Sequence, residues 1–434
     1  MKKSVRCCAI VLVLLSQSFA ADWPRFRGPA GDGKSLETGL LQKWPAAGPR
    51  LVWSVEGVGD GWSSVSVVNG WVYTTGLIGK EKTGFVFAVS PEGKIAWQQP
   101  YGPGWKGAHP GTHSTPTVDG DRLYVMSGYG LIACYNRTTG KGIWKIDCKE
   151  VFGAAVLKWG IAESVLIYDD KVICTPGGTK ATMVALDKMT GKTIWTNLVL
   201  TIKKVNGKEE KVGQKSAYCT PSLIKANGKE LIMQSVQKSI ILVEPETGKV
   251  ICDIPHEKRH DLAAAAPVYY NNSIYVTTGY ERDDFPDRGY MFQLSADLTS
   301  GKLKWTDRNL DCHHGGVVLL DGCVHGTTSA IYAPASNERP KGNWICLDLN
   351  SGKVKYKAKL MGKGSAIYAD GKLYCYGETG VMALVKATAT GYEMVSSFEI
   401  TRGDKEHWAH PAISNGILYI RHGKAVMAYD IRRQ

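Results

Sequence analysis

The chain has 434 residues, a formal net charge of +13 at pH 7 and high counts of Gly (49), Trp (13) and Tyr (20) in an otherwise ordinary globular composition. This bias is typical of many short strands joined by tight turns. Beyond residue 20, no stretch approaches the roughly 20 consecutive apolar residues that a membrane span needs. The composition therefore excludes a membrane-spanning helical protein and favours a globular, strand-rich one.

The first 20 residues have the pattern of a bacterial secretory signal. Basic residues precede a short apolar run, and a small-x-small triplet precedes Ala21. We expect residues 1–20 to be removed, which lowers the formal charge to +10, and the mature chain to be periplasmic or secreted. The basic residues lost are Lys2, Lys3 and Arg6. We expect the remaining lysines to be solvated and evenly spread. We also expect no nucleic-acid partner, because an exported protein does not meet the genome.

The cysteines do not form an obvious disulfide framework. Eleven are present, and nine remain after removal of the signal, an odd number for an oxidising compartment. Within the repeat described below, Cys134 and Cys346 fall at positions otherwise held by alanine, and Cys174 and Cys375 at positions held by valine or isoleucine. Cysteine behaves as a small hydrophobe at such interior positions. We predict mostly free, buried thiols, with no C-x-x-C metal spacing and no lipid-attachment cysteine at the cleavage point.

Residues 21–47 lack the alternation of a strand. They read DWPRFRGP at 22–29 and continue as a Gly-rich stretch. The prediction is a strap that crosses the outside of the following domain, and the alternative is a ligand-binding arm.

A Gly-Lys pair recurs through the rest of the chain and marks an internal repeat. In the best-preserved copy, residues 185–195 read ALDKMTGKTIW: an apolar run, a tight turn ending in glycine, and an alternating run that ends on an aromatic residue. The repeated glycines are Gly93, Gly140, Gly191, Gly248, Gly301 and Gly352, which are 47, 51, 57, 53 and 51 residues apart. This spacing indicates a propeller whose repeats each form four short strands.

The aromatic residue four positions after each turn glycine can lie across the joint between neighbouring sheets. Counting these positions gives eight units, of which the seventh is degenerate. The column reads Trp53, Trp97, Trp144, Trp195, Cys252, Trp305, Tyr356 and, out of pattern, Val395.

The two ends of the chain complement each other. Residues 51–55 resemble the fourth strand of a blade whose first three strands are missing upstream. Matching strands occur at 410–413, 417–420 and 425–430. Pairing the termini would close the ring and remove its free edges. We therefore predict a single all-β domain over 48–434, an eight-bladed β-propeller of four-stranded blades whose last blade is closed by the N-terminal strand.

The repeat resembles that of the pyrroloquinoline-quinone-like propellers, whose unit runs Ala-x-Asp-x-x-Thr-Gly-x-x-x-Trp. The pattern is nearly intact at 185–195 and recognisable at 134–144, which reads CYNRTTGKGIW, and the resemblance covers roughly residues 48–434. Quinoprotein alcohol dehydrogenases, an outer-membrane-protein assembly propeller and exported proteins of unassigned role belong to this family. The resemblance therefore implies the fold rather than one function. Quinone-dependent members use adjacent cysteines, whereas the only adjacent pair here, Cys7 and Cys8, lies in the signal.

The first strands of a propeller line its channel, and the residues just before them form one mouth, where ligands commonly bind. The first strands are anchored at Val65, Pro116, Val165, Pro221, Pro267, Val317, Ala366 and Pro411. Three positions earlier stand Trp62, His113, Ala162, Tyr218, Ala264, His314, Lys363 and Trp408, six of which are aromatic or ionisable. His410 directly precedes the last anchor, and His109, His260, His313 and His407 flank the same mouth. We predict that Trp62, His113, Tyr218, His260, His314, Lys363, Trp408 and His410 bind a ligand there.

Histidine clusters can bind transition metals or supply acid–base groups, but no pair here has the local spacing of a metal motif. We predict a non-catalytic binding or scaffold module that engages a protein or glycan at the mouth, with no metal and no resident cofactor. One alternative is a dehydrogenase that uses pyrroloquinoline quinone with calcium, and the other is a carbohydrate-active enzyme that uses the mouth histidines.

Carboxylates near the mouth are Glu163, Asp261, Asp311 and Glu406. Glu163, Asp261, Lys363 and Trp408 would be candidates to hold the quinone and its calcium.

Overall fold

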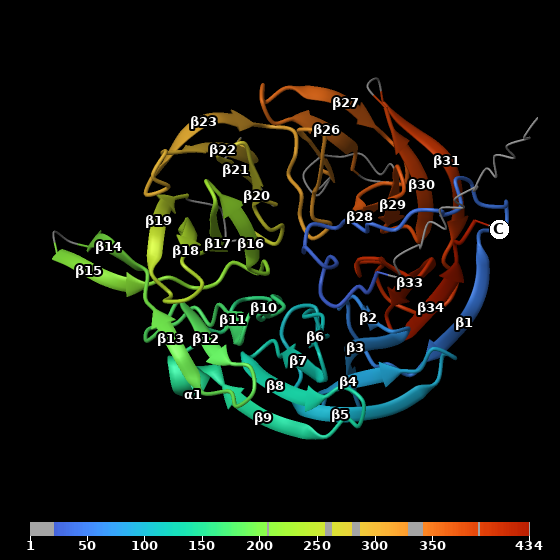
Figure 1. Ribbon diagram of the computed structural model, residues 1–434, viewed down its shortest axis with the longest axis horizontal. Coiled ribbons are helices and arrows are strands. Elements are labelled where there is room, and N and C mark those ends of the chain that lie inside the picture. The colour runs from blue at the N-terminus through green and yellow to red at the C-terminus, as the bar shows by residue number, and fades with distance from the viewer. Residues whose placement is uncertain are drawn as a thin grey trace, which may run out of the picture.

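The computed structural model describes residues 21–205, 208–256, 263–279, 287–328, 342–388 and 391–433. Within them, eight four-stranded antiparallel sheets stand in a ring around a central channel (Figure 1). The one helix of the described ranges, α1 (Cys148–Phe152), follows the second blade. No helix in these ranges is long and apolar enough to cross a membrane. The predicted eight-bladed all-β propeller is confirmed.

Each blade runs from an innermost to an outermost strand in chain order. Blade 1 consists of β2 (Ser66–Val68), β3 (Trp71–Ile78), β4 (Thr83–Val89) and β5 (Ile95–Pro103); blade 2 of β6 (Thr117–Asp119), β7 (Arg122–Met126), β8 (Leu131–Asn136) and β9 (Gly142–Asp147); blade 3 of β10 (Leu166–Tyr168), β11 (Lys171–Cys174), β12 (Met183–Asp187) and β13 (Thr193–Asn197); and blade 4 of β16 (Ser222–Ala226), β17 (Lys229–Val236), β18 (Ser239–Val243) and β19 (Val250–Pro255).

The second half of the ring follows the same plan. Blade 5 consists of β20 (Val268–Tyr270), β21 (Ser273–Thr277), β22 (Gly289–Leu294) and β23 (Gly301–Asp307); blade 6 of β24 (Val318–Leu320), β25 (Cys323–Thr327), β26 (Trp344–Asp348) and β27 (Val354–Ala358); and blade 7 of β28 (Gly364–Ala369), β29 (Lys372–Gly377), β30 (Val381–Ala387) and β31 (Tyr392–Glu399). A separate hairpin of β14 (Leu200–Val205) and β15 (Lys208–Gly213) projects between blades 3 and 4.

Blade 8 joins the two ends of the chain. It consists of β32 (Ala412–Ser414), β33 (Ile417–His422) and β34 (Ala425–Asp430), and β1 (Arg50–Glu56) is its outermost strand. β1 pairs antiparallel with β34 from Arg50 opposite Asp430 to Glu56 opposite Ala425. The predicted closure by the N-terminal strand is therefore present, and it leaves no gap in the ring of blades.

Neighbouring blades are joined by a tryptophan on the outer strand of one and the turn glycine of the next. A Cβ on Gly191 would come within 2.8 Å of the Trp144 ring, so only glycine allows this contact. The Trp144 Nε1 also donates a hydrogen bond of 3.1 Å to the Lys188 carbonyl of the same turn. Three further joints have both contacts: Trp53 with Gly93, Trp97 with Gly140 and Trp195 with Gly248. The repeat thus encodes both the turn and the surface on which the preceding blade packs.

The degenerate seventh unit differs from the prediction. In the pairing of β30 with β31, Ser397 lies opposite Ala383, the alanine-column position, so Ser397 and not Val395 occupies the aromatic column. β31 is eight residues long and the two strands shift register between Leu384 and Val385. Counting four residues forward from Gly391 fails here because eight residues separate Ala383 from Gly391, whereas six separate Ala185 from Gly191.

All nine cysteines of the described residues are unpaired thiols. Eight are buried and Cys323 is half-buried. The prediction of mostly free, buried cysteines is confirmed. Their small apolar side chains fill the space between adjacent sheets, as the alanine and valine of the other blades do.

The N-terminal strap enters the channel instead of crossing the outside, which corrects the prediction. Trp23 exchanges backbone hydrogen bonds of 2.8 Å with Val67 of β2, and the Val118 amide of β6 donates to the Pro24 carbonyl (2.8 Å). Gly33 and Ser35 bond in the same way to Tyr368 of β28. The innermost strands expose a free edge to the channel, and the strap satisfies several of those backbone groups. Residues 36–48 then run outward along blades 7 and 8, where Trp44 packs on Tyr374 and Phe398.

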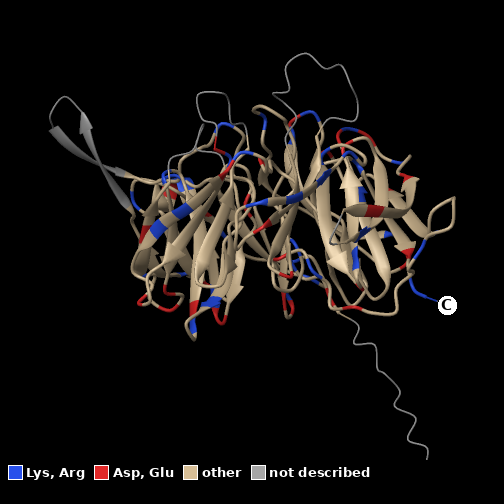
Figure 2. Cartoon of the chain, turned by 90° about the horizontal axis from the view of Figure 1, so that it is seen from above, with Lys and Arg blue, Asp and Glu red and all other residues tan. Residues whose placement is uncertain are grey.

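Charges are distributed over the whole ring. In the side view, Lys and Arg residues alternate with Asp and Glu along the described ribbon and do not gather on one face (Figure 2). This distribution agrees with the expectation of solvated lysines.

A buried arginine fixes blade 8 to blade 1. The Arg421 side chain is 1% exposed, and it donates hydrogen bonds to Thr74 Oγ1 (2.8 Å) and to the Gly59 carbonyl (3.2 Å), and also to Ser63 and to the Thr75 carbonyl. Burial lowers the pKa of Arg421 to about 9, so the guanidinium is still protonated at neutral pH. It therefore supplies several donors to a cluster of buried oxygens beside the seam.

We expect Arg421→Met to lower the free energy of unfolding by at least about 3 kcal/mol, because several buried oxygens lose their donors. The matched control is Arg50→Met, which removes an exposed arginine from its pair with Asp430 (2.8 Å) within blade 8 and should cost less than about 1 kcal/mol. Guanidinium unfolding curves of the two variants measure the difference. Equal losses would show that the buried guanidinium does not hold the seam.

Candidate binding site at one mouth of the channel

The residues that precede the innermost strands converge at one end of the channel. They enclose a cavity of about 210 Å³ lined by His109, His113, Trp159, Ala162, Tyr218, Ala264, His313, His314, Lys363 and Trp408. Seven of the eight positions read from the repeat register are in this lining, and Trp62 is the exception. The regular blade therefore places equivalent residues of seven blades around one cavity.

One wall of the cavity is a stack of aromatic rings. Trp62, which is buried, stacks on His113 with ring centroids 5.4 Å apart and planes 10° apart, and it packs on Trp408 at 5.1 Å. His314 continues the row on the other side of Trp408 at 5.3 Å. The Trp62 Nε1 donates to Glu406 (3.2 Å), which fixes the orientation of its indole. Trp62 thus supports the wall from behind and is not in the lining itself.

A second aromatic pair comes from blades 3 and 4. The Trp159 and Tyr218 rings meet edge to face with centroids 5.6 Å apart, and the Lys158 ammonium lies 4.7 Å from the Trp159 ring. Tyr218 has a φ of +78°, a conformation that non-glycine residues rarely adopt. A parallel backbone bridge between Tyr218 and Ala263 holds this conformation. Strained backbone of this kind is often found at ligand sites.

The polar groups of the cavity form a connected chain. The Glu378 carboxylate accepts from His314 Nε2 (3.0 Å) and from the Lys363 ammonium (3.2 Å). His314 Nδ1 lies 3.1 Å from His313 Nδ1. Glu378, His314 and His313 thus form a continuous line of polar contacts.

Three histidines of the cavity, His113, His313 and His314, are biased toward their neutral forms. Burial lowers the pKa of His113 to about 4, and the nearby His109 lowers it further. Burial also lowers the pKa of His313 well below its usual value. For His314, burial lowers the pKa although the bond to Glu378 opposes the shift. Burial by itself would raise the pKa of Glu378, but His314 and Lys363 outweigh it and the pKa is lowered. Near pH 7 the cavity therefore combines neutral imidazoles with an ammonium–carboxylate pair.

His410 lies beneath the cavity and not in its lining. Its Nε2 is 2.8 Å from the His314 carbonyl and its Nδ1 is 3.4 Å from the Arg27 guanidinium of the strap. The Phe26 ring packs edge to face on it at 4.9 Å. Burial, together with Arg27, lowers the pKa of His410 to about 3. His410 thus lies between His314 of the mouth and Arg27 of the strap.

Two of the four flanking histidines, His260 and His407, are not part of the observed cavity lining. His407 is stacked on His422 at 3.7 Å and bonds to the Tyr376 hydroxyl through Nδ1 (2.5 Å), so it holds the loop before blade 8. His260 lies outside the described residues, and its predicted role stays a prediction. His109 and His313 are in the lining as expected.

The carboxylates do not assemble into a calcium site. Glu163 is fully buried and accepts from the Thr175 amide (2.5 Å) and from Gln234 (3.2 Å), away from the cavity. Asp311 is buried and lies 3.7 Å from Arg288. Asp261 lies outside the described residues. Calcium in a quinone site needs several oxygen ligands, whereas the cavity lining presents histidine, lysine and indole. In the described ranges no group of three or more His, Cys, Asp or Glu is arranged to hold a metal ion. These residues do not fit quinone with calcium.

The sequence did not indicate three residues at or beside the cavity. Trp159 stands six positions before its anchor and was outside the register position that was read. Glu378 lies after β29 and reaches the mouth from the strand turn, which the register does not predict. Arg27 comes from the strap, whose path the sequence did not reveal. Of these three residues, only Trp159 could have been found from the sequence, by a search for aromatic residues over the whole segment before each anchor.

The sequence of residues 82–358 matches the family model described as outer membrane protein assembly factor BamB. The chain belongs to the BamB family. No curated protein gives a match. Among solved structures, BamB from Moraxella catarrhalis is similar with a TM-score of 0.57 and 14% identity over 88% of this chain and 99% of that one.

Two enzymes of similar fold lie at the same low level of identity. The quinohemoprotein alcohol dehydrogenase from Comamonas testosteroni gives a TM-score of 0.68 and 13% identity, covering 95% of this chain and 81% of that one. A europium-containing methanol dehydrogenase gives 0.54 and 12%, covering 94% and 90%. Identities this low show a shared fold only. The BamB family and the quinoprotein enzymes therefore share the propeller architecture predicted from the repeat.

The buried carboxyl Glu163 should give this propeller a characteristic pH dependence. Burial raises its pKa to about 8, so the folded chain holds a proton that the unfolded chain releases above its ordinary pKa of 4.5. The free energy of unfolding should therefore fall by a few kcal/mol as the pH rises from about 5 to 8. Thermal unfolding of Glu163→Gln across this range should show a shallower slope than the native chain. Glu393→Gln, at an exposed position of β31, is the control, and equal slopes in all three proteins would contradict the assignment.

Proposed function

We propose that this protein is an exported, non-catalytic binding module that receives a protein partner at the mouth lined by Trp159, Tyr218 and Trp408. One observation carries the proposal: aromatic faces stand on two sides of the cavity, while its charged groups are bonded to one another. Such a site offers large apolar contact area and a few oriented donors, which is how rigid aromatic residues bind side chains of a partner.

Family membership supports a protein partner, because the family takes its description from an outer-membrane-protein assembly factor. The signal-like residues 1–20 support export. A resident quinone or metal is not part of the proposal, since the lining does not supply the oxygen ligands that calcium requires.

The proposal is tested by photo-crosslinking in cells that export the chain. A benzoylphenylalanine in place of Lys158, which is exposed beside Trp159, should give a discrete adduct with another protein, and Trp408→Ala should reduce that adduct at least fivefold. The same photoreactive residue in place of Ile194, which is 41% exposed on the outer strand of the same blade, is the matched control. Equal adducts from both positions would contradict a mouth site. Saturable binding of a glycan that Trp408→Ala abolishes would reassign the partner to a carbohydrate.

An acid–base enzyme acting on carbohydrate is the second candidate, and the Glu378–His314–His313 chain favours it. A carboxylate that orients one imidazole, which in turn orients another, can position a general base. If this chain is catalytic, His313→Gln should abolish cleavage of a polysaccharide panel while His407→Gln, outside the cavity, retains it. Absence of cleavage by the native chain, together with the crosslink from position 158, would favour the binding module.

A further inference from the structure

The opposite end of the channel is only partly filled by the strap. The strap bonds to the innermost strands of blades 1, 2 and 7, and Arg27 donates to the Val317 carbonyl before blade 6 (2.6 Å). The innermost strands on that side are buried: all three residues of β2 and of β32, and nearly all of β28. By contrast, four of the five residues of β16 and all three of β20 are partly exposed or exposed. The strap thus leaves the channel edge of blades 4 and 5 uncovered.

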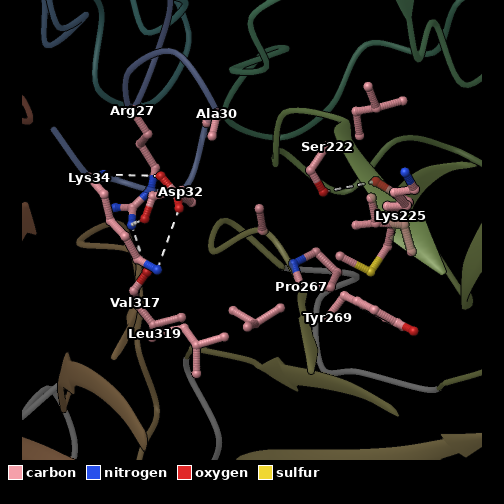
Figure 3. Close-up of a pocket in the computed structure, with 17 residues that line it drawn as sticks. Arg27, Ala30, Asp32, Lys34, Ser222, Lys225, Pro267, Tyr269, Val317 and Leu319 are labelled. Atoms are coloured by element: carbon pink, nitrogen blue, oxygen red, sulfur yellow. Dashed lines mark hydrogen bonds and ion pairs between the residues drawn. The ribbon is translucent and has the colours of Figure 1, made fainter. Parts of the chain in front are cut away.

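A cavity of about 210 Å³ lies at this uncovered edge. On one side are the strap residues Arg27, Asp32 and Lys34, and across from them are residues of β16 and β20, including Lys225 and Tyr269 (Figure 3). The floor between them is apolar. Its members are Leu223, Ile224, Met233, Val268 and Leu319. This site is separate from the mouth, because His410 and Arg27 lie between them.

The free edge of the innermost strands is already used as a pairing surface within this chain. Trp23 and Val67 exchange two backbone hydrogen bonds, and Tyr368 donates to the Gly33 carbonyl and accepts from the Ser35 amide. Among the described residues, no backbone bond outside the blade engages β16 or β20. Unpaired strand edges accept an extended chain from elsewhere. The strap therefore shows the mode by which a second extended segment would bind to blades 4 and 5.

The charges around this cavity indicate which kind of extended segment would bind there. Its lining contains the cations Arg27, Lys34 and Lys225 and one carboxylate, Asp32, which pairs with Lys34 at 3.6 Å. Lys225 is exposed, and Glu230, opposite it in the register, accepts a bond from the Tyr168 hydroxyl instead of lining the cavity. The surplus of positive charge next to an apolar floor favours alternating apolar and acidic side chains.

We propose that the cavity between the strap and blades 4 and 5 binds an extended acidic peptide segment of a partner protein, which adds as a strand to the free edge of β16 or β20. Its apolar side chains lie on the floor formed by Leu223, Ile224 and Val268, and its carboxylates lie near Lys225 and Lys34. The site is distinct from the mouth proposed above and does not depend on that assignment.

The test uses the mature chain and a fluorescein-labelled peptide of alternating glutamate and valine, six residues long, with the lysine–valine peptide as its matched control. Fluorescence anisotropy should show saturable binding of the glutamate peptide and at least tenfold weaker binding of the lysine peptide. Lys225→Glu should weaken binding at least tenfold, whereas Lys229→Glu, exposed on β17 of the same blade and outside the lining, should leave it unchanged. Equal affinities of the two variants, or no saturable binding to the native chain, would overturn the proposal.

Backbone pairing is tested separately from charge. Two analogues of the glutamate peptide, N-methylated at alternate residues in the two possible phases, keep every side chain but lose the donors along one edge. At least one should bind more than tenfold more weakly, and undiminished binding of both would exclude strand addition. A photoreactive group at the central valine should attach to 222–226 or 268–270. Attachment to residues of the mouth would overturn the placement.

Discussion

The joint between adjacent blades is the interaction on which the rest of this structure depends. A four-stranded sheet cannot bury both of its faces alone, so each blade is stable only between two neighbours. The Trp144 indole on the Gly191 turn shows how the sequence secures that contact: the glycine permits close approach, and a carbonyl of the same turn receives the indole proton. Because one eleven-residue motif supplies both partners, repeating it along the chain gives four joints the same pair of contacts.

The regular repeat also explains how residues far apart in the chain come together at the mouth. The connection into each innermost strand starts from an equivalent place in each blade, so residues about 50 positions apart in the chain meet around one opening. Each blade is then free to carry a different side chain there without disturbing its sheets. The result is a set of aromatic and ionisable groups from six blades on a rigid scaffold, in which burial keeps the imidazoles neutral and Glu378 holds Lys363 in place.

The fold could be predicted from the sequence because the repeat is a local signal: turn, alternation and aromatic position lie within eleven residues. The lining positions His113, Tyr218, His314, Lys363 and Trp408 followed from the same register. What the register could not supply were contacts made by irregular segments. Arg27 reaches His410 across 383 positions, and Glu378 comes from a turn between strands. The path of the strap was mispredicted because its backbone bonds are to channel edges, which leave no pattern in the side chains.

The closure of blade 8 has a consequence for the order in which the molecule can be completed. β1 is made before any complete blade, yet its partner β34 ends only at Asp430, close to the end of the chain. The strap, made earlier still, needs edges from blades 1, 2 and 7 before all its bonds can form. The first described segments of the chain are thus among the last to find their places. Until β34 has been made, β1 lacks the strand with which it pairs and blade 8 is incomplete, so closure of the ring requires nearly the whole chain.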